Sequence, residues 1–156
     1  TDACTAGNAQ WGTEASCVTA CAAFTAGTPG DISGDTLECR AYHAGVASTT
    51  SPEVHCVHAG PLGGGVTAGD GCGTSRCDSF CRVATEVCEG EGVYVFTSED
   101  DCRTQCMAYT DGDDFSTSDT SGNDLQCRMY HLTAAAAEPA GNRTHCAHLA
   151  GSLCMN

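Results

Sequence analysis

The chain has 156 residues, enough for one ordinary domain or two small ones, and 14 of them are cysteines. The reducing cytosol would not sustain that many cystines, so we expect a secreted, extracellular protein whose sequence starts after a removed signal peptide. Twenty acidic residues against six arginines and no lysine give a net charge of −14, which argues against nucleic-acid partners, and no apolar run approaches the roughly 20 residues that membrane insertion needs.

The first predicted helix begins after Thr13, which stands where an N-cap belongs. Cys17, Cys21 and Phe24 follow at i, i+4 and i+7, so they form one stripe on this helix. A second helix is predicted after Asp35 as its cap. One face of that second helix has Cys39, Tyr42, His43 and Val46. The glycine-rich stretch 58–73 is predicted to be irregular.

The second half of the chain predicts three more helices. The spacing of Cys77, Cys81 and Cys88 indicates the first of them. The next begins after Ser98 as N-cap, with Asp101 at the capping-box position. It has the stripe Cys102, Cys106 and Tyr109. The last is predicted after Asn123 as its cap, and the alanine run 134–137 favours it.

These elements form an internal repeat. The string "CRAYH" at 39–43 returns as "CRMYH" at 127–131, and "HCVHAG" at 55–60 returns as "HCAHLAG" at 145–151. We therefore predict two tandem helical modules, residues 1–73 and 74–156, with long irregular loops. Module one has no counterpart of the segment with Cys77 and Cys81. The predicted fold class is small, disulfide-rich and mainly α.

The cysteines divide into six in module one and eight in module two, so each module could close its own bridges. Neither module is long enough for a large apolar core, and disulfides would contribute about 2–4 kcal/mol each. We expect all fourteen to be bridged, with a connectivity that the spacing leaves open: Cys4, Cys17, Cys21, Cys39, Cys56, Cys72, Cys77, Cys81, Cys88, Cys102, Cys106, Cys127, Cys146 and Cys154.

The order Cys-x3-Cys, Cys-Arg-x-Tyr-His and His-Cys-x-His-Ala-Gly-Pro-x-Gly-Gly-Gly resembles an uncharacterised cysteine-rich repeat of secreted and lipoprotein-like sequences. That family is found among predicted proteins of myxobacteria and microbial eukaryotes. The resemblance covers nearly the whole chain, twice, although module two shortens the final loop to "HLAGSLC". It implies a repeated extracellular module and no catalytic residues.

All six histidines occupy equivalent positions of the repeat. Three imidazoles in a module is the number that a zinc or copper site with an open fourth position uses. The alternative, which we favour, is that the rings pack beside cystines and bond backbone carbonyls, with no cofactor. The histidines are His43, His55 and His58 in module one and His131, His145 and His148 in module two.

Other residues with a chemical signature have simpler interpretations. Arg40 and Arg128 repeat, and in so acidic a chain we expect structural ion pairs or carbonyl contacts rather than anion binding. Asn142 begins an Asn-x-Thr acceptor, which predicts a glycoprotein and possible glycans. No Gly-x-Ser-x-Gly, His-Glu-x-x-His or phosphate loop is present, so no catalytic residue and no enzyme is predicted.

These observations favour an extracellular structural protein that assembles with itself into a filament or surface layer. Because module one lacks the leading helix, its stripe around Val18 and Phe24 should be covered by module two of a neighbour, giving a head-to-tail homopolymer. One alternative is a secreted module that binds zinc or copper through three histidines per repeat. Another is a small cysteine-rich effector or hydrolase inhibitor.

Overall fold

The computed structural model describes residues 3–64, 71–151 and 154 of the chain. Within these residues there are helices and long loops, with no β-strand. None of these helices is long and apolar enough to cross a bilayer. The small, disulfide-rich, mainly α fold class is therefore confirmed. In chain order the elements are η1 (Ala6–Asn8), α1 (Glu14–Cys21), α2 (Leu37–Ala47), α3 (Pro52–Ala59), α4 (Arg76–Cys88), α5 (Glu99–Cys106), α6 (Leu125–Ala137) and η2 (Thr144–Leu149).

Two of the predicted N-caps are confirmed. The side chain of Thr13 accepts a hydrogen bond from the Ser16 amide at the start of α1. The side chain of Ser98 does the same for the Asp101 amide in α5. The capping-box role of Asp101 is wrong, because its carboxylate accepts from the Thr97 amide, at 2.9 Å, one residue before the N-cap. Each cap satisfies amides that the first helical turn leaves without partners.

The other two predicted caps lie one residue too early. Thr36 caps α2 and Asp124 caps α6, each by accepting from the amide three residues later. The side chains of Asp35 and Asn123 instead accept hydrogen bonds from Arg40 and Arg128. The sequence pattern at these boundaries does not distinguish a helix cap from a partner for an arginine one turn later.

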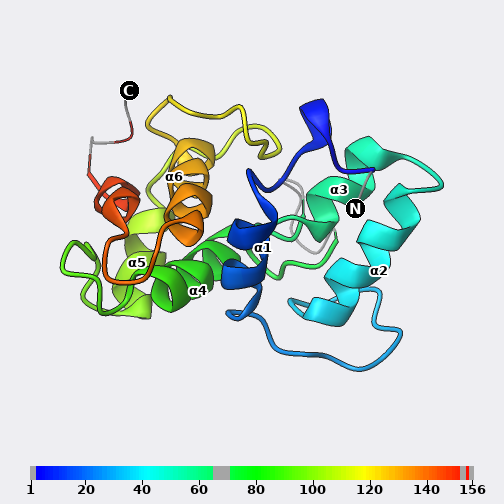
Figure 1. The fold of residues 1–156 in the computed structure, drawn as a ribbon, viewed down its shortest axis with the longest axis horizontal. Helices are drawn as coiled ribbons and strands as arrows, with labels where there is room; N and C mark the ends of the chain where they lie inside the picture. Colours follow the sequence, from blue (N-terminus) through cyan, green and yellow to red (C-terminus); the bar gives the residue numbers. More distant parts are fainter. Residues whose placement is uncertain (1–2, 65–70, 152–153, 155–156) are drawn as a thin grey trace.

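The helices form two groups, with α1 between them (Figure 1). In one group α2 packs along α3, and in the other α4 packs on α5 and α6, while η2 packs on α6. Every disulfide in the described chain joins cysteines on the same side of the predicted boundary at residue 73. The pairs are Cys4–Cys56, Cys39–Cys72, Cys77–Cys106, Cys81–Cys102, Cys88–Cys146 and Cys127–Cys154.

The predicted helix with Cys77 and Cys81 is α4, and it packs against α5 as expected. The region predicted to be irregular is helical in its first residues, because α3 extends to Ala59. Residues 65–70 of that region lie outside the described part of the chain. The sequence patterns did not predict α3 and η2, which are short, with eight and six residues.

The core is centred on α4 and α6 and extends to α1. Phe80, Val83 and Leu132 are among its fully buried side chains. Ala20 on α1 and Phe24, just after the end of that helix, join this core, and α1 packs on α6 and α4. Phe24 is only 5% exposed. The Arg40 guanidinium lies over its ring, so Phe24 itself leaves little surface for a neighbouring molecule, and its role in self-association stays a prediction.

Both repeated arginines have structural contacts, which confirms that interpretation. The Arg40 guanidinium lies 3.5 Å from the centre of the Phe24 ring and pairs with Asp35 at 2.6 Å. The Arg128 guanidinium lies 3.9 Å from the Tyr109 ring and bonds the Asn123 side chain at 2.7 Å. These matched arrangements hold α2 and α6 to the chain segments that follow α1 and α5.

Candidate functional site

The three histidines of module one lie together between α2 and α3. His43 comes from α2, and His55 and His58 come from α3. The Nδ1 atom of His43 lies 2.9 Å from Nδ1 of His55 and 3.4 Å from Nδ1 of His58. His43 and His58 are buried, whereas His55 is half-buried. The structure thus brings together three nitrogen ligands that are 12 and 3 residues apart in sequence.

The orientation of the His43 ring is fixed from its other side. Its Nε2 atom lies 3.2 Å from the carbonyl oxygen of Ile32. A carbonyl oxygen can only accept, so Nε2 is the protonated nitrogen and the Nδ1 lone pair points into the cluster. Ligand histidines in metal sites commonly have such a hydrogen bond on the far nitrogen. Ile32 had no signal in the sequence, because the contact uses its backbone.

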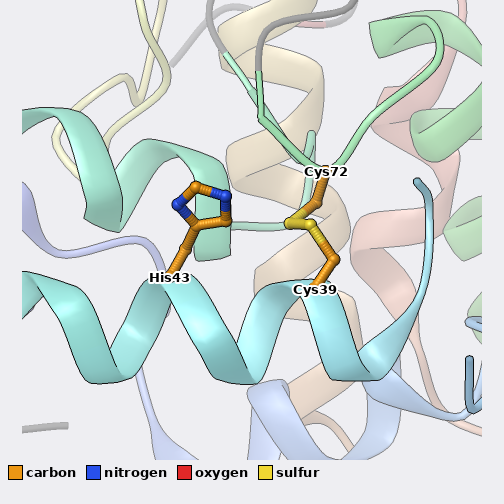
Figure 2. Close-up of side chains that lie close together, drawn as sticks. All are labelled: Cys39, His43 and Cys72. Atoms are coloured by element: carbon orange, nitrogen blue, oxygen red, sulfur yellow. A yellow bond between two sulfur atoms is a disulfide. The ribbon is translucent and has the colours of Figure 1, made fainter. Parts of the chain in front are cut away.

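The ring of His43 also lies beside a cystine (Figure 2). Cys39 precedes it by one turn on α2, and Cys72 comes from the loop after α3. The expectation that the histidines pack beside bridges is therefore confirmed for this ring. Both sulfurs are in a disulfide bond, so neither is a thiolate that could bind a metal.

The equivalent histidines of module two are arranged differently. The His131 ring stacks on His148, with centroids 4.5 Å apart and planes inclined by 17°. His145 bonds the Glu138 carboxylate at 2.9 Å. Burial, together with the two neighbouring histidines, lowers the pKa of His131 to about 4. The His131 ring is therefore stacked between its neighbours, one of which is held by a carboxylate, and the nitrogens of the three rings do not converge as they do in module one.

The difference between the two clusters follows from local structure. The segment with His55 and His58 is an α-helix that starts with Pro52, whereas the segment with His145 and His148 is the 3-10 helix η2. A 3-10 helix turns by a larger angle per residue, so the same spacing points the rings in other directions. Module two also has Glu138, which module one lacks at the equivalent place.

Twelve cysteines are bridged, and the remaining two, Cys17 and Cys21, are free thiols. This differs from the expectation that all fourteen pair. Their equivalents in module two, Cys102 and Cys106, bond to two cysteines of α4. No helix occupies that position in the described part of module one, so the two thiols face each other with their Sγ atoms 3.7 Å apart.

The pKa values of the two thiols shift in opposite directions. The hydrogen bond from Cys21 lowers the pKa of Cys17 to about 7, and the same bond together with burial raises the pKa of Cys21. A thiolate is the reactive form in disulfide exchange, so Cys17 is the nucleophile of the pair at neutral pH. Both side chains are half-buried and reach the surface.

A largely apolar cavity of about 180 Å³ opens beside these thiols. Trp11 and the α2 residues Ala41 and Ala44 contribute to its wall, as do both thiols. Val18, on the adjacent surface of α1, is 67% exposed. Trp11 and Phe96 each stand six residues before the next cysteine of the repeat, but this spacing does not indicate a cavity wall.

The acceptor Asn142 lies on an exposed turn before η2, where its amide bonds the Pro139 carbonyl. The position is accessible, and glycosylation there stays a prediction.

Comparison with known proteins gives one match. A family model described as the BfoA family C-terminal domain matches residues 1–73, which are the bounds predicted for module one. No curated protein and no solved structure matches the chain. Module one is thus similar to the BfoA family C-terminal domain, an uncharacterised family.

Proposed function

We propose that this protein is an extracellular structural protein whose copies are joined by disulfides through Cys17 and Cys21. The observation that supports the proposal is the pair of free thiols on α1, held 3.7 Å apart at the edge of an apolar cavity. The other twelve cysteines are bridged, as in proteins of oxidising compartments. Two accessible thiols in such a compartment are suited to joining molecules.

The bridges between α4 and α5 show how two helices of this type join. Each helix has two cysteines four residues apart, and the first cysteine of one bonds the second cysteine of the other. This crossed order is that of two antiparallel helices. The helix α1 has the same spacing, so two copies of α1 can meet antiparallel and form two equivalent bridges. Each bridge would join Cys17 of one copy to Cys21 of the other.

Such a contact uses the same surface on both molecules and closes as a two-fold pair. The sequence favoured a head-to-tail chain, in which module two of a neighbour covers the stripe that ends at Phe24. The chain's own α6 already packs on α1, whose buried residues are Ser16 and Ala20. The two-fold pair instead uses the side of α1 with the thiols, where Val18 remains exposed. Larger assemblies would need a second contact elsewhere.

The two bridges form by oxidation of four thiols. Each bridge releases two protons and two electrons, which reduce one molecule of a small disulfide to two thiols. The low pKa of Cys17 makes its thiolate the attacking group, and its attack on the small disulfide gives a mixed disulfide and releases one small thiol. Cys21 of the other copy then attacks the Cys17 sulfur of that mixed disulfide, which forms the bridge and releases the second small thiol.

The test is the size of the native protein without reductant, measured by light scattering and by intact mass. We expect a species of two chains that thiol-alkylating reagents do not label. Reductant should separate this species into monomers. Replacing both thiols, Cys17→Ser with Cys21→Ser, should give monomers under all conditions. Val18→Glu is the matched surface variant, and it should slow dimer formation while leaving the monomer folded.

Three results would contradict the proposal, and two of them would be seen in a protein that stays monomeric. One is a wild-type monomer in which two thiols take up alkylating reagent after exposure to a small disulfide. The other is a monomer with no free thiol, which would mean that Cys17 and Cys21 bond within one helix. A covalent partner that is not a second copy would also overturn it.

A further inference from the structure

We propose that His43, His55 and His58 form a binding site for one zinc or copper ion, and that the equivalent histidines of module two do not. The proposal does not depend on dimer formation, because the cluster lies between α2 and α3. Each of His43, His55 and His58 offers one ring nitrogen, and these three nitrogens all lie within 4.8 Å of one another.

The spacing of the nitrogens fits a tetrahedral ion. With zinc–nitrogen bonds of about 2.0–2.1 Å, two ligands of a tetrahedral site lie about 3.3 Å apart. The Nδ1 atoms of His43 and His58 are 3.4 Å apart, and those of His43 and His55 are 2.9 Å apart. The second pair would move apart by a few tenths of an ångström to accept an ion. Imidazole nitrogen suits zinc and copper in particular.

The hydrogen bonding around the cluster also fits a ligand set. The carbonyl of Ile32 holds the proton of His43 on Nε2, so the Nδ1 lone pair points toward the other two rings. The Nδ1 atom of His43 faces the Nδ1 atoms of His55 and His58 at 2.9 Å and 3.4 Å. An ion would replace these nitrogen–nitrogen contacts by three bonds to lone pairs, leaving a fourth position for water.

The scaffold keeps the ligands in place. Cys56, which lies directly after His55, is bonded to Cys4, and this bridge fixes α3 to the N-terminal segment. The Cys39–Cys72 bridge fixes α2 one turn before His43. The ligands therefore come from two helices that pack together and are each cross-linked, which reduces the cost of ordering the site.

Module two provides a control within the same chain. His131 and His148 are stacked with centroids 4.5 Å apart, and His145 is bonded to Glu138. An ion bound by all three rings there would have to separate the stack and break the contact between His145 and Glu138. The structure therefore predicts one ion per chain, whereas the sequence repeat alone predicts two or none.

The test uses the Cys17→Ser, Cys21→Ser chain, so that thiolates cannot bind the metal. After dialysis against a chelator, zinc and copper(II) are titrated separately by calorimetry, and bound metal is counted by elemental analysis. We expect one ion per chain for at least one metal. His55→Ala, at the half-buried position, should weaken metal binding more than about 100-fold. Removing a residue that only hydrogen-bonds to a metal ligand already lowers metal affinity about 10–100-fold. His145→Ala should bind as tightly as its parent.

A second measurement identifies the ligands directly. The electron paramagnetic resonance spectrum of bound copper(II) should show coupling to three nitrogens in the parent chain and in His145→Ala. Circular dichroism should show that both histidine variants fold. Binding of no ion, binding of two ions, or an equal loss in both histidine variants would overturn the proposal. In a chain that keeps Cys17 and Cys21, His55→Ala should lose the ion and still form the dimer. That result would separate the metal site from the proposed assembly function.

Discussion

Replacing Asp35 with asparagine should destabilise the protein strongly, because Asp35 balances two arginines in a buried position. Its carboxylate lies 2.6 Å from Arg40 and 3.0 Å from Arg82, and it accepts a hydrogen bond from Ser79 at 3.2 Å. The Asp35 and Arg40 side chains are 6% and 5% exposed. This network connects the loop before α2 to α4, so it joins the two halves of the molecule.

The size of the effect follows from the groups that remain. Removing one partner of a buried ion pair typically costs about 3–5 kcal/mol, because the other charge stays buried. Burial already lowers the pKa of Arg40, and Asp35 opposes that shift. Arg40 would keep its hydrogen bond to the Gly60 carbonyl, at 3.2 Å. We therefore expect the lower end of the range, about 3 kcal/mol, for Asp35→Asn.

The assay is guanidinium unfolding at pH 7 with all disulfides intact, followed by circular dichroism. Asp100→Asn is the matched control, since that carboxylate also pairs with an arginine but is 94% exposed. It should change the free energy of unfolding by less than about 0.5 kcal/mol. If the two variants agree within about 0.5 kcal/mol, the buried network does not stabilise the fold as we infer.

Two further predictions concern pH and backbone conformation. Because the folded-state pKa of His131 is about 4 against an ordinary 6.5, stability should be highest above pH 6.5 and fall by about 3 kcal/mol as pH drops to 4. The difference between wild type and His131→Gln in pH-dependent melting measures this, and parallel profiles would refute it. Gly63→Ala should cost about 2–4 kcal/mol, since Gly63 has φ +75° and a Cβ there would lie 2.7 Å from the Gly73 amide nitrogen. Gly45→Ala, in a helix with open space around it, should instead stabilise by about 0.5–1 kcal/mol in the same unfolding experiment, and a cost at both sites would contradict the reasoning.

The sequence by itself determined the fold class and the approximate positions of five of the helices. These follow from local patterns: the periodic cysteines, the caps Thr13 and Ser98, and the repeat that marks equivalent positions. The structural role of Arg40 and Arg128 also followed, because an acidic chain offers partners for repeated arginines. Disulfide connectivity did not follow, since spacing alone allows many pairings.

Tertiary structure decided the features on which the candidate sites depend. The stripes on α1 and α5 match in sequence, yet Cys17 and Cys21 stay free because the pairing of their equivalents requires a helix such as α4 beside them. The two histidine sets match as well, yet only that of module one converges, because α3 and η2 turn by different angles per residue. Local sequence fixes which side chains a helix presents, whereas their partners come from segments far away in the chain.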